Sequence, residues 1–337
     1  MRKSAFGFPL TAAVLALTVA LPSTGFSQTL LAGERDALVP GITGVVAQGA
    51  SWSLIWADFV TADGIMGTPD GGVMFAQEQT DKITRLTTDG QQFTVFENMN
   101  APGSVAADNE GRLFTVQRTC TEPMNAELAG CNELTRVMQI APETRLLANS
   151  YADGRPLGRV NDLIADGMGG AYVTSGGVFH VSASGEVTVV EDKDIFSNGI
   201  MLSRNGRTLF ITNNSEVLAF DVARNGSTSN RRKFASLNGD TGGDGMALDE
   251  EGRLYVTANL GIHVIAENGD YVGLIPTPRR AITLTFSGPD KRTLYVPMMG
   301  AVGPDGKVWS TPEGIRNTAM TIYTLPMQTA GFSGRPK

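Results

Sequence analysis

The pattern that most constrains the fold of this 337-residue chain is a tight turn followed by a short apolar strand, which occurs six times. The copies are DGGVMFA (70–76), EGRLFTV (110–116), MGGAYVT (168–174), NGRTLFIT (205–212), EGRLYVT (251–257) and DKRTLYVP (290–297). Most copies start about 40 residues after the previous one, and the widest gap is 58 residues, from 110 to 168. This period, with β-branched and aromatic runs between Gly, Asp and Asn turns, is typical of a four-stranded propeller blade. The sequence therefore predicts an all-β, six-bladed β-propeller rather than a β-sandwich.

The two ends of the repeat region predict how the propeller closes. The last repeat contains only three strand-like runs and ends at TIYTLP (321–326), while SWSLIWAD (51–58) reads as an extra strand before the first repeat. Pairing that segment with the last blade would remove an open sheet edge. We therefore expect the propeller at 51–326, an N-terminal extension at 28–50 and a C-terminal tail at 327–337.

The first 27 residues have the features of a signal peptide. Arg2 and Lys3 are followed by an apolar run at 10–21, and Gly25 and Ser27 are small residues at suitable cleavage positions. The run is short for a transmembrane helix, although a short membrane anchor is the alternative. The prediction is cleavage before Gln28 and secretion, to the periplasm, with no membrane attachment afterwards.

Composition and cysteine content limit the partners. The net charge of −7 argues against binding to nucleic acid or to an anionic membrane. We expect a monomer or a small homo-oligomer. Cys120 and Cys131 fit no zinc motif, and after export they are expected to form a local disulfide. They fall in the long gap, so a stiffened flap at 119–134 over the site is one reading and a surface insertion is the other.

Aligning the six repeats on the turn glycine reveals a set of polar positions. The residues eight places earlier, at the expected start of each innermost strand, are Asp63, Gly103, Asn161, Asn198, Asp244 and Thr283. Innermost strands line the central channel of a propeller, so these residues should form one ring. Four of the six offer a carboxylate or amide oxygen, the donors that hard divalent cations prefer. A metal-binding channel is thus predicted; the alternative is that these residues cap strands and hold water.

The remaining arginines and histidines, and the motifs that are missing, narrow the choice of site residues and exclude some enzyme classes. Arg159 precedes Asn161 in a loop on the ring side, where a guanidinium can grip a substrate oxygen. Arg279 and Arg280 fall in the corresponding loop of the last blade and are predicted to be surface residues. His180 and His263 share a blade position away from the channel, which indicates structural roles. No nucleophile elbow, phosphate loop or dinucleotide fingerprint is present.

With this ring in place, the chain resembles the senescence marker protein/gluconolactonase/luciferin-regenerating enzyme family. The segments that carry the resemblance are GRVNDLIADGMGGAYVT, SNGIMLSRNGRTLFIT, GDGMALDEEGRLYV and IPTPRRAITLTFSGPDKRTLYV. The resemblance implies one divalent metal in the channel of a six-bladed propeller. It implies Asn198 and Asp244 as metal ligands, Arg159 and Asn161 as substrate-binding residues, and Asp244 as the general base. The family's first-blade ligand is a glutamate in an E-G-P motif, and here Asp63 in ADGIMG stands at that position, one methylene shorter.

The resulting prediction is a secreted, metal-dependent hydrolase that opens the ring of a lactone, a sugar aldonolactone or a similar compound. The ion, Ca²⁺ in preference to Mg²⁺, Zn²⁺ or Mn²⁺, would polarise the carbonyl, and Asp244 would assist the attacking water. Two alternatives stay open: a propeller that binds a sugar-like ligand or a partner without turnover, and a propeller enzyme acting on another ester or phosphoester.

Overall fold

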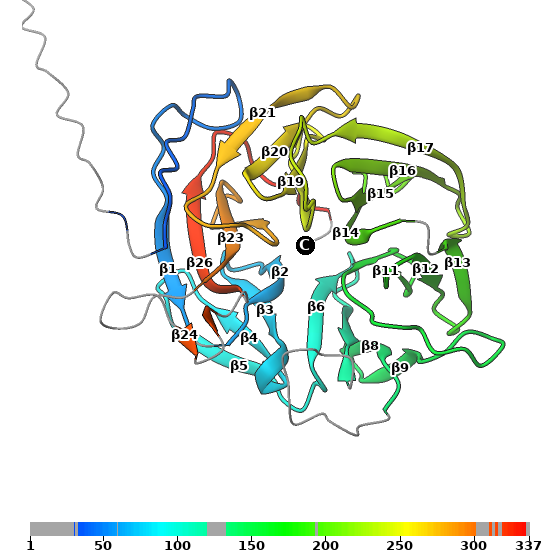
Figure 1. Cartoon of the computed structure of the whole chain (residues 1–337). Coiled ribbons are helices and arrows are strands. Elements are labelled where there is room, and N and C mark those ends of the chain that lie inside the picture. The colour runs from blue at the N-terminus through cyan, green and yellow to red at the C-terminus, as the bar shows by residue number, and fades with distance from the viewer. Residues whose placement is uncertain are drawn as a thin grey trace, which may run out of the picture.

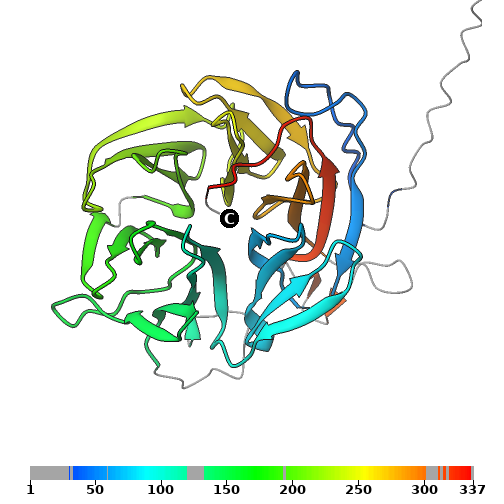
Figure 2. The same cartoon turned by 180° about the vertical axis from the view of Figure 1, so that it is seen from behind.

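The computed structural model describes residues 30, 33–58, 60–119, 133–192, 195–300, 310–311, 314–315 and 319–334. Within these ranges the chain is almost entirely β-structure, arranged as six four-stranded sheets around a central axis (Figures 1 and 2). The prediction of a six-bladed β-propeller is confirmed. The predicted signal peptide, Cys120 and Cys131 lie outside the described residues.

Each blade is an antiparallel meander whose first strand lies closest to the axis. The first three blades comprise β2 (Asp63–Gly67), β3 (Val73–Gln77), β4 (Lys82–Leu86) and β5 (Gln92–Phe96); β6 (Pro102–Ala107), β7 (Leu113–Gln117), β8 (Arg136–Ala141) and β9 (Arg145–Ala148); and β10 (Leu163–Ala165), β11 (Ala171–Thr174), β12 (Val178–Val181) and β13 (Val187–Glu191). The next two comprise β14 (Ser197–Leu202), β15 (Thr208–Asn213), β16 (Glu216–Val222) and β17 (Thr228–Ser236); and β18 (Met246–Leu248), β19 (Leu254–Thr257), β20 (Gly261–Ile265) and β21 (Tyr271–Pro276).

The sixth blade closes the ring with strands from both ends of the chain. Its order is β22 (Thr285–Ser287), β23 (Thr293–Met299), β26 (Ala319–Pro326) and then β1 (Ser53–Ala57) on the outside. β1 pairs antiparallel with β26, and Trp56 lies opposite Ile322. Blue and red ribbons lie together at this blade in Figure 1. The predicted closure by the 51–58 segment is confirmed, and it leaves no unpaired edge on β26.

The turns between the first and second strands explain why the repeat is visible in the sequence. The six aligned turn positions all have positive φ, from 55° at Lys291 to 93° at Gly169, and five of them are glycine, which adopts this conformation without strain. In three blades an aspartate three residues earlier caps the turn. In blade five, Asp249 accepts hydrogen bonds from the backbone N–H groups of Glu251 (3.0 Å) and Arg253 (2.9 Å).

The core consists of apolar side chains packed between neighbouring blades. The large fully buried side chains include Tyr172, Tyr255, Phe75, Phe114 and Phe179. The 28–50 extension contributes Val39, Val45 and Val46 to the cluster of blades five and six. Beyond β26, Gly331 bridges to Asp249, and the described part of the tail runs toward the propeller axis on the side of the capped turns (Figure 2).

Helical structure is nearly absent from the described part of the chain. The short 3₁₀ helix η1 (Glu78–Thr80) follows β3, and a two-residue hairpin pair, β24 (Ser310–Thr311) and β25 (Gly314–Ile315), precedes β26. No helix in the described residues is long and apolar enough to span a membrane.

Candidate functional site

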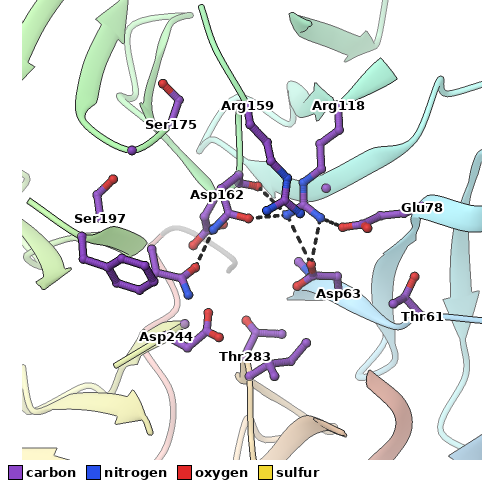
Figure 3. A pocket seen from close by; sticks show the side chains of 18 of the residues that line it. Thr61, Asp63, Glu78, Arg118, Arg159, Asp162, Ser175, Ser197, Asp244 and Thr283 are labelled. Atoms are coloured by element: carbon purple, nitrogen blue, oxygen red, sulfur yellow. Dashed lines mark hydrogen bonds and ion pairs between the residues drawn. The ribbon is translucent and has the colours of Figure 1, made fainter. Parts of the chain in front are cut away.

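The six aligned ring positions line one cavity at the mouth of the central channel. The cavity has a volume of about 560 Å³, and its lining includes Asp63, Gly103, Asn161, Asn198, Asp244 and Thr283. Each lies at the start of an innermost strand or within two residues of it. In Figure 3, the side chains of Asp63, Asp244 and Thr283 point toward the same central space. The repeat alignment thus predicted which residues meet in the folded chain.

Glycines hold neighbouring ring residues close together. A Cβ atom on Gly64 would lie 2.1 Å from the Cα of Ser104 in the next blade, and one on Gly199 would lie 2.1 Å from the backbone oxygen of Asp244. One on Gly245 would lie 2.5 Å from Oγ1 of Thr283. Real side chains cannot approach so closely, so the glycine after Asp63, Asn198 and Asp244 is required by the contact between adjacent blades.

Asp244 lies in the most unusual electrostatic environment of the ring. Its position away from bulk water raises its carboxyl pKa well above the ordinary value, and the carboxylates of Asp63 and Asp162 raise it further. The positive charge of Arg280 and a hydrogen bond from Asn198 act in the opposite direction. The net direction is upward, so the protein groups around Asp244 do not supply the positive charge that a buried carboxylate requires.

A chain of hydrogen bonds connects the ring from the second blade to the fourth. Arg118 donates to Oδ1 of Asn161, and Nδ2 of Asn161 donates to Oδ1 of Asn198 at 2.5 Å. The side chain of Asn198 in turn lies near Asp244 and lowers the pKa of its carboxyl. Because a guanidinium can only donate, Arg118 sets the amide orientation of Asn161, and this orientation is passed on to Asn198.

Arg118 and Glu78 are residues of the site that the sequence reasoning missed. Arg118 follows β7 and is 3% exposed, and Glu78 begins η1 and is 4% exposed; they form an ion pair beside the ring. Arg118 also lies 3.4 Å from Oδ2 of Asp63. A Cβ atom on Gly103 would come within 2.5 Å of the Arg118 Nε atom, so glycine at this ring position leaves room for the guanidinium.

The remaining walls of the cavity differ in polarity. Arg159 is exposed and lines the mouth of the cavity, where Figure 3 shows it beside Arg118. Ile195, Phe196, Ile282 and Met299 form an apolar part of the lining, and the Phe196 side chain is 64% exposed. A bound molecule would therefore meet apolar groups as well as charged and amide groups.

Four residues that the sequence analysis placed outside the channel can now be compared with their positions in the structure. His180 pairs with Asp166 at 2.8 Å and His263 with Asp240 at 3.0 Å, and neither histidine lines the cavity, in line with structural roles. The surface role predicted for Arg279 is wrong, because this residue is 5% exposed and donates to the Tyr323 hydroxyl at 3.0 Å. The two adjacent arginines could not be told apart in the sequence, although Arg280 is exposed and Arg279 is buried.

The ring residues fit a divalent cation in donor chemistry. Asp63, Asn198 and Asp244 provide two carboxylates and one amide oxygen, and the raised pKa of Asp244 indicates missing positive charge. In the described ranges, no cluster of three His, Cys, Asp or Glu side chains has metal-site geometry. That result is compatible with this trio because one member is an amide, and Asp63 is in addition engaged by Arg118.

Sequence comparison assigns the family. Residues 61–299, more than two thirds of the chain, match the model described as "SMP-30/Gluconolactonase/LRE-like region". The chain belongs to this family. It is 25% identical over 193 residues to a gluconolactonase of Zymomonas mobilis, in a match that covers 48% of this chain and only 54% of that protein. Regucalcin of Xenopus laevis is 28% identical over 242 residues, which cover 67% of this chain and 79% of that protein.

Comparison with solved structures supports the same fold. A gluconolactonase from Xanthomonas campestris superposes with a TM-score of 0.67 at 18% identity, covering 89% of this chain and 98% of the other. At this identity the likeness concerns the fold. Family membership therefore rests on residues 61–299, the range that contains every ring position.

Proposed function

We propose that this protein is a secreted, metal-dependent hydrolase that opens the ring of a lactone. The observation that carries the proposal is the ring of oxygen donors around one cavity in a chain related to gluconolactonases. The cavity of about 560 Å³ has the size of a small-molecule site. Its polar residues suit hydroxyl and carbonyl oxygens, and its apolar residues suit a ring face or an alkyl substituent.

Asn198 and Asp244 would hold the metal ion, and Asp63, which Arg118 also contacts, would be the third ligand when it is released to the ion. When bound, such an ion supplies a Lewis acid for a lactone carbonyl. Carboxylate and amide oxygens favour Ca²⁺; Mg²⁺, Mn²⁺ and Zn²⁺ are the other candidates.

The chain's own residues would bind the substrate and move the proton. Asp244 would accept the proton of the attacking water, because its carboxylate lines the cavity where the water and the lactone would meet. Arg159 at the mouth donates to substrate oxygens. Asn161 gives one Nδ2 hydrogen to Asn198 and directs the other toward the substrate.

A second candidate function is a propeller that binds a sugar-like ligand without turnover. The observation in its favour is the contact between Asp63 and Arg118, which engages the first-blade carboxylate. Retained metal and ligand binding with no hydrolysis of any ester would support this candidate. Hydrolysis confined to another ester or phosphoester would instead change the substrate class.

Lactone hydrolysis by the purified mature protein tests the proposal. Proton release is followed over a panel of aldonolactones and alkyl lactones, with phosphotriesters included, after EDTA treatment and after addition of each divalent ion. Turnover of one lactone class that EDTA abolishes and one ion restores is the expected result. No turnover of any lactone with any ion would refute a lactonase.

Export and the disulfide belong to the same proposal. Mass spectrometry of the periplasmic fraction should show a mature protein that starts at Gln28 and has Cys120 joined to Cys131. If the 119–134 segment is a flap over the site, reduction should change KM for large lactones more than it lowers the melting temperature. Unchanged kinetics after complete reduction of the disulfide would show that the 119–134 segment is not a flap over the site.

A further inference from the structure

Arg118 places a fixed positive charge at the channel mouth, beside the ring carboxylates. Its side chain passes over Gly103, the second-blade ring position, where a Cβ atom would lie 2.5–2.9 Å from three guanidinium atoms. The residue is 3% exposed and lies 3.4 Å from Oδ2 of Asp63. The second blade therefore contributes a cation to the ring where other blades contribute oxygen atoms.

The guanidinium is fully committed to protein partners. Nε donates to the backbone oxygen of Val160 at 3.2 Å, Nη1 is paired with Glu78, and Nη2 donates to Asn161. Nη1 and Nη2 both lie 3.4 Å from Oδ2 of Asp63. Since all three nitrogens are engaged, a role as a direct substrate ligand is disfavoured, and the remaining effect of Arg118 is on its neighbours.

Asp63 is engaged at both carboxylate oxygens. Its Oδ1 accepts the backbone N–H of Gly64 at 2.8 Å, and its Oδ2 faces Arg118. A divalent ion that used Asp63 would have to share this carboxylate with the guanidinium and would meet the guanidinium charge at close range. Opposite charges a few ångströms apart attract each other strongly at a partly buried site, and like charges repel each other as strongly.

Glu78 explains how a buried arginine is tolerated at this point. It occupies the same place in blade one as Arg118 does in blade two, seven residues after the turn glycine, and it is 4% exposed. The pair is therefore an ion pair between equivalent positions of adjacent blades. Removing Arg118 alone would leave Glu78 buried without its cation, which is strongly destabilising.

We propose that Arg118 is a built-in counter-cation of the channel, which holds Asp63 and thereby limits how tightly the ring binds a divalent ion. The proposal rests on the proposed function only in that a divalent ion enters the ring. The affinity for the ion is thus set by a competition between the ion and Arg118 for the carboxylate of Asp63. Arg118 does not engage the other two ligands, Asn198 and Asp244.

Isothermal titration of EDTA-stripped protein with Ca²⁺, and separately with Mn²⁺, tests this competition. The informative variant is Arg118→Met combined with Glu78→Gln, which removes both buried charges and keeps the net charge of the pair unchanged. Arg118→Met alone is measured as well where it folds. Arg112→Met is the matched control, since Arg112 is an arginine of the same blade paired with Asp108 at the turn between β6 and β7, away from the cavity.

The double variant should bind the ion at least about tenfold more tightly than the wild type, because Asp63 becomes available and the repulsion is lost. Asp63→Asn should change the affinity of the wild type less than about threefold, and should weaken the double variant at least about tenfold. The control should match the wild type.

Three results would overturn the proposal: a double variant with an intact melting transition and unchanged or weaker affinity, an equal effect of Asp63→Asn in both backgrounds, or no divalent binding by any variant. Lactone turnover is a separate readout. If no lactone is hydrolysed, the proposed lactonase activity is wrong. The ion affinities of the wild type and the variants, measured by titration, would still test the role of Arg118.

Discussion

At the scale of single residues, Asp244 combines the two roles that the proposed chemistry needs. It lies at the ring, contacts Asn198 and has a carboxyl pKa raised by burial and by neighbouring carboxylates. Asp244→Asn keeps the shape of the side chain and removes its charge and basicity. We expect turnover to fall at least about 100-fold, the lower end of the contribution of a general base, and metal binding to weaken with it. Titration calorimetry and lactone kinetics measure the two effects.

Asp270→Asn provides a control for this substitution, because Asp270 lies on an exposed turn of the same blade. The control should keep wild-type kinetics. Full activity in Asp244→Asn would remove this residue from the mechanism.

Arg159 should act on substrate binding more than on the chemical step. Lysine at this position keeps the charge but loses the planar fork that grips two oxygens. Arg159→Lys should therefore raise KM for an active lactone about tenfold, a loss of about 1.4 kcal/mol of binding, while kcat changes little. Arg155→Met, in the same loop and paired with Asp153, is the control. A lower kcat with unchanged KM would contradict the assigned role.

The sequence predicted the ring because the turn glycines fix a common register for all six blades. Counting eight residues back from each turn led to residues that line one cavity. Counting seven residues forward would have led to Glu78 and Arg118, opposite charges at equivalent positions of adjacent blades. Their ion pair was not predicted because charged residues at strand ends are usually solvated, and burial there depends on how two blades meet.

At the scale of elements, the capped turn is the unit that makes a blade. In blade five, Asp249 is fully buried and accepts hydrogen bonds from two backbone N–H groups, from Nε of Arg253 at 2.6 Å and from the Tyr255 hydroxyl at 2.9 Å. Asp249→Ala leaves these donors without their acceptor. We expect a loss of about 3 kcal/mol or more in the free energy of unfolding, measured by urea denaturation.

Asp290→Ala is the comparison for this turn. Asp290 is exposed in the equivalent region of blade six, where it accepts one backbone hydrogen bond, and its loss should cost about 0.5 kcal/mol or less. Equal destabilisation by the two substitutions would show that the buried cap is not what stabilises the turn.

A strand could be predicted from the sequence where an apolar run follows a recognisable turn. It was harder to predict where the strand is short and packs against the neighbouring blades. In blade five, the apolar run that ends the repeat EGRLYVT (251–257) forms β19. The innermost strands β10, β18 and β22 are only three residues long, so their ring residues precede the regular pairing. Sequence periodicity cannot mark such short ends, because they are defined by contacts with the next blade.

At the scale of the whole molecule, the site exists only while the ring is closed. Trp56 on β1 is central to the closure, since its indole N–H donates to Gln92 of blade one at 2.9 Å and its ring packs against Phe75 at 5.1 Å. Trp56→Ala should destabilise the protein by about 3–5 kcal/mol, as expected for loss of a buried tryptophan. Thermal and urea unfolding provide the measurement.

Ile55 offers a matched control on the same strand. Its side chain is 36% exposed, so Ile55→Ala should cost much less than Trp56→Ala. Similar unfolding midpoints for the wild type and Trp56→Ala would contradict a closure that depends on this contact.

Metal-dependent lactone hydrolysis at the ring can be tested in one experiment, in which a divalent ion is titrated into EDTA-stripped protein. Ion binding and initial lactone hydrolysis are recorded on the same sample. We expect no turnover without the ion, and half-maximal turnover at the ion concentration that half-saturates a single site. Full turnover in EDTA, or activity that does not follow occupancy, would contradict it.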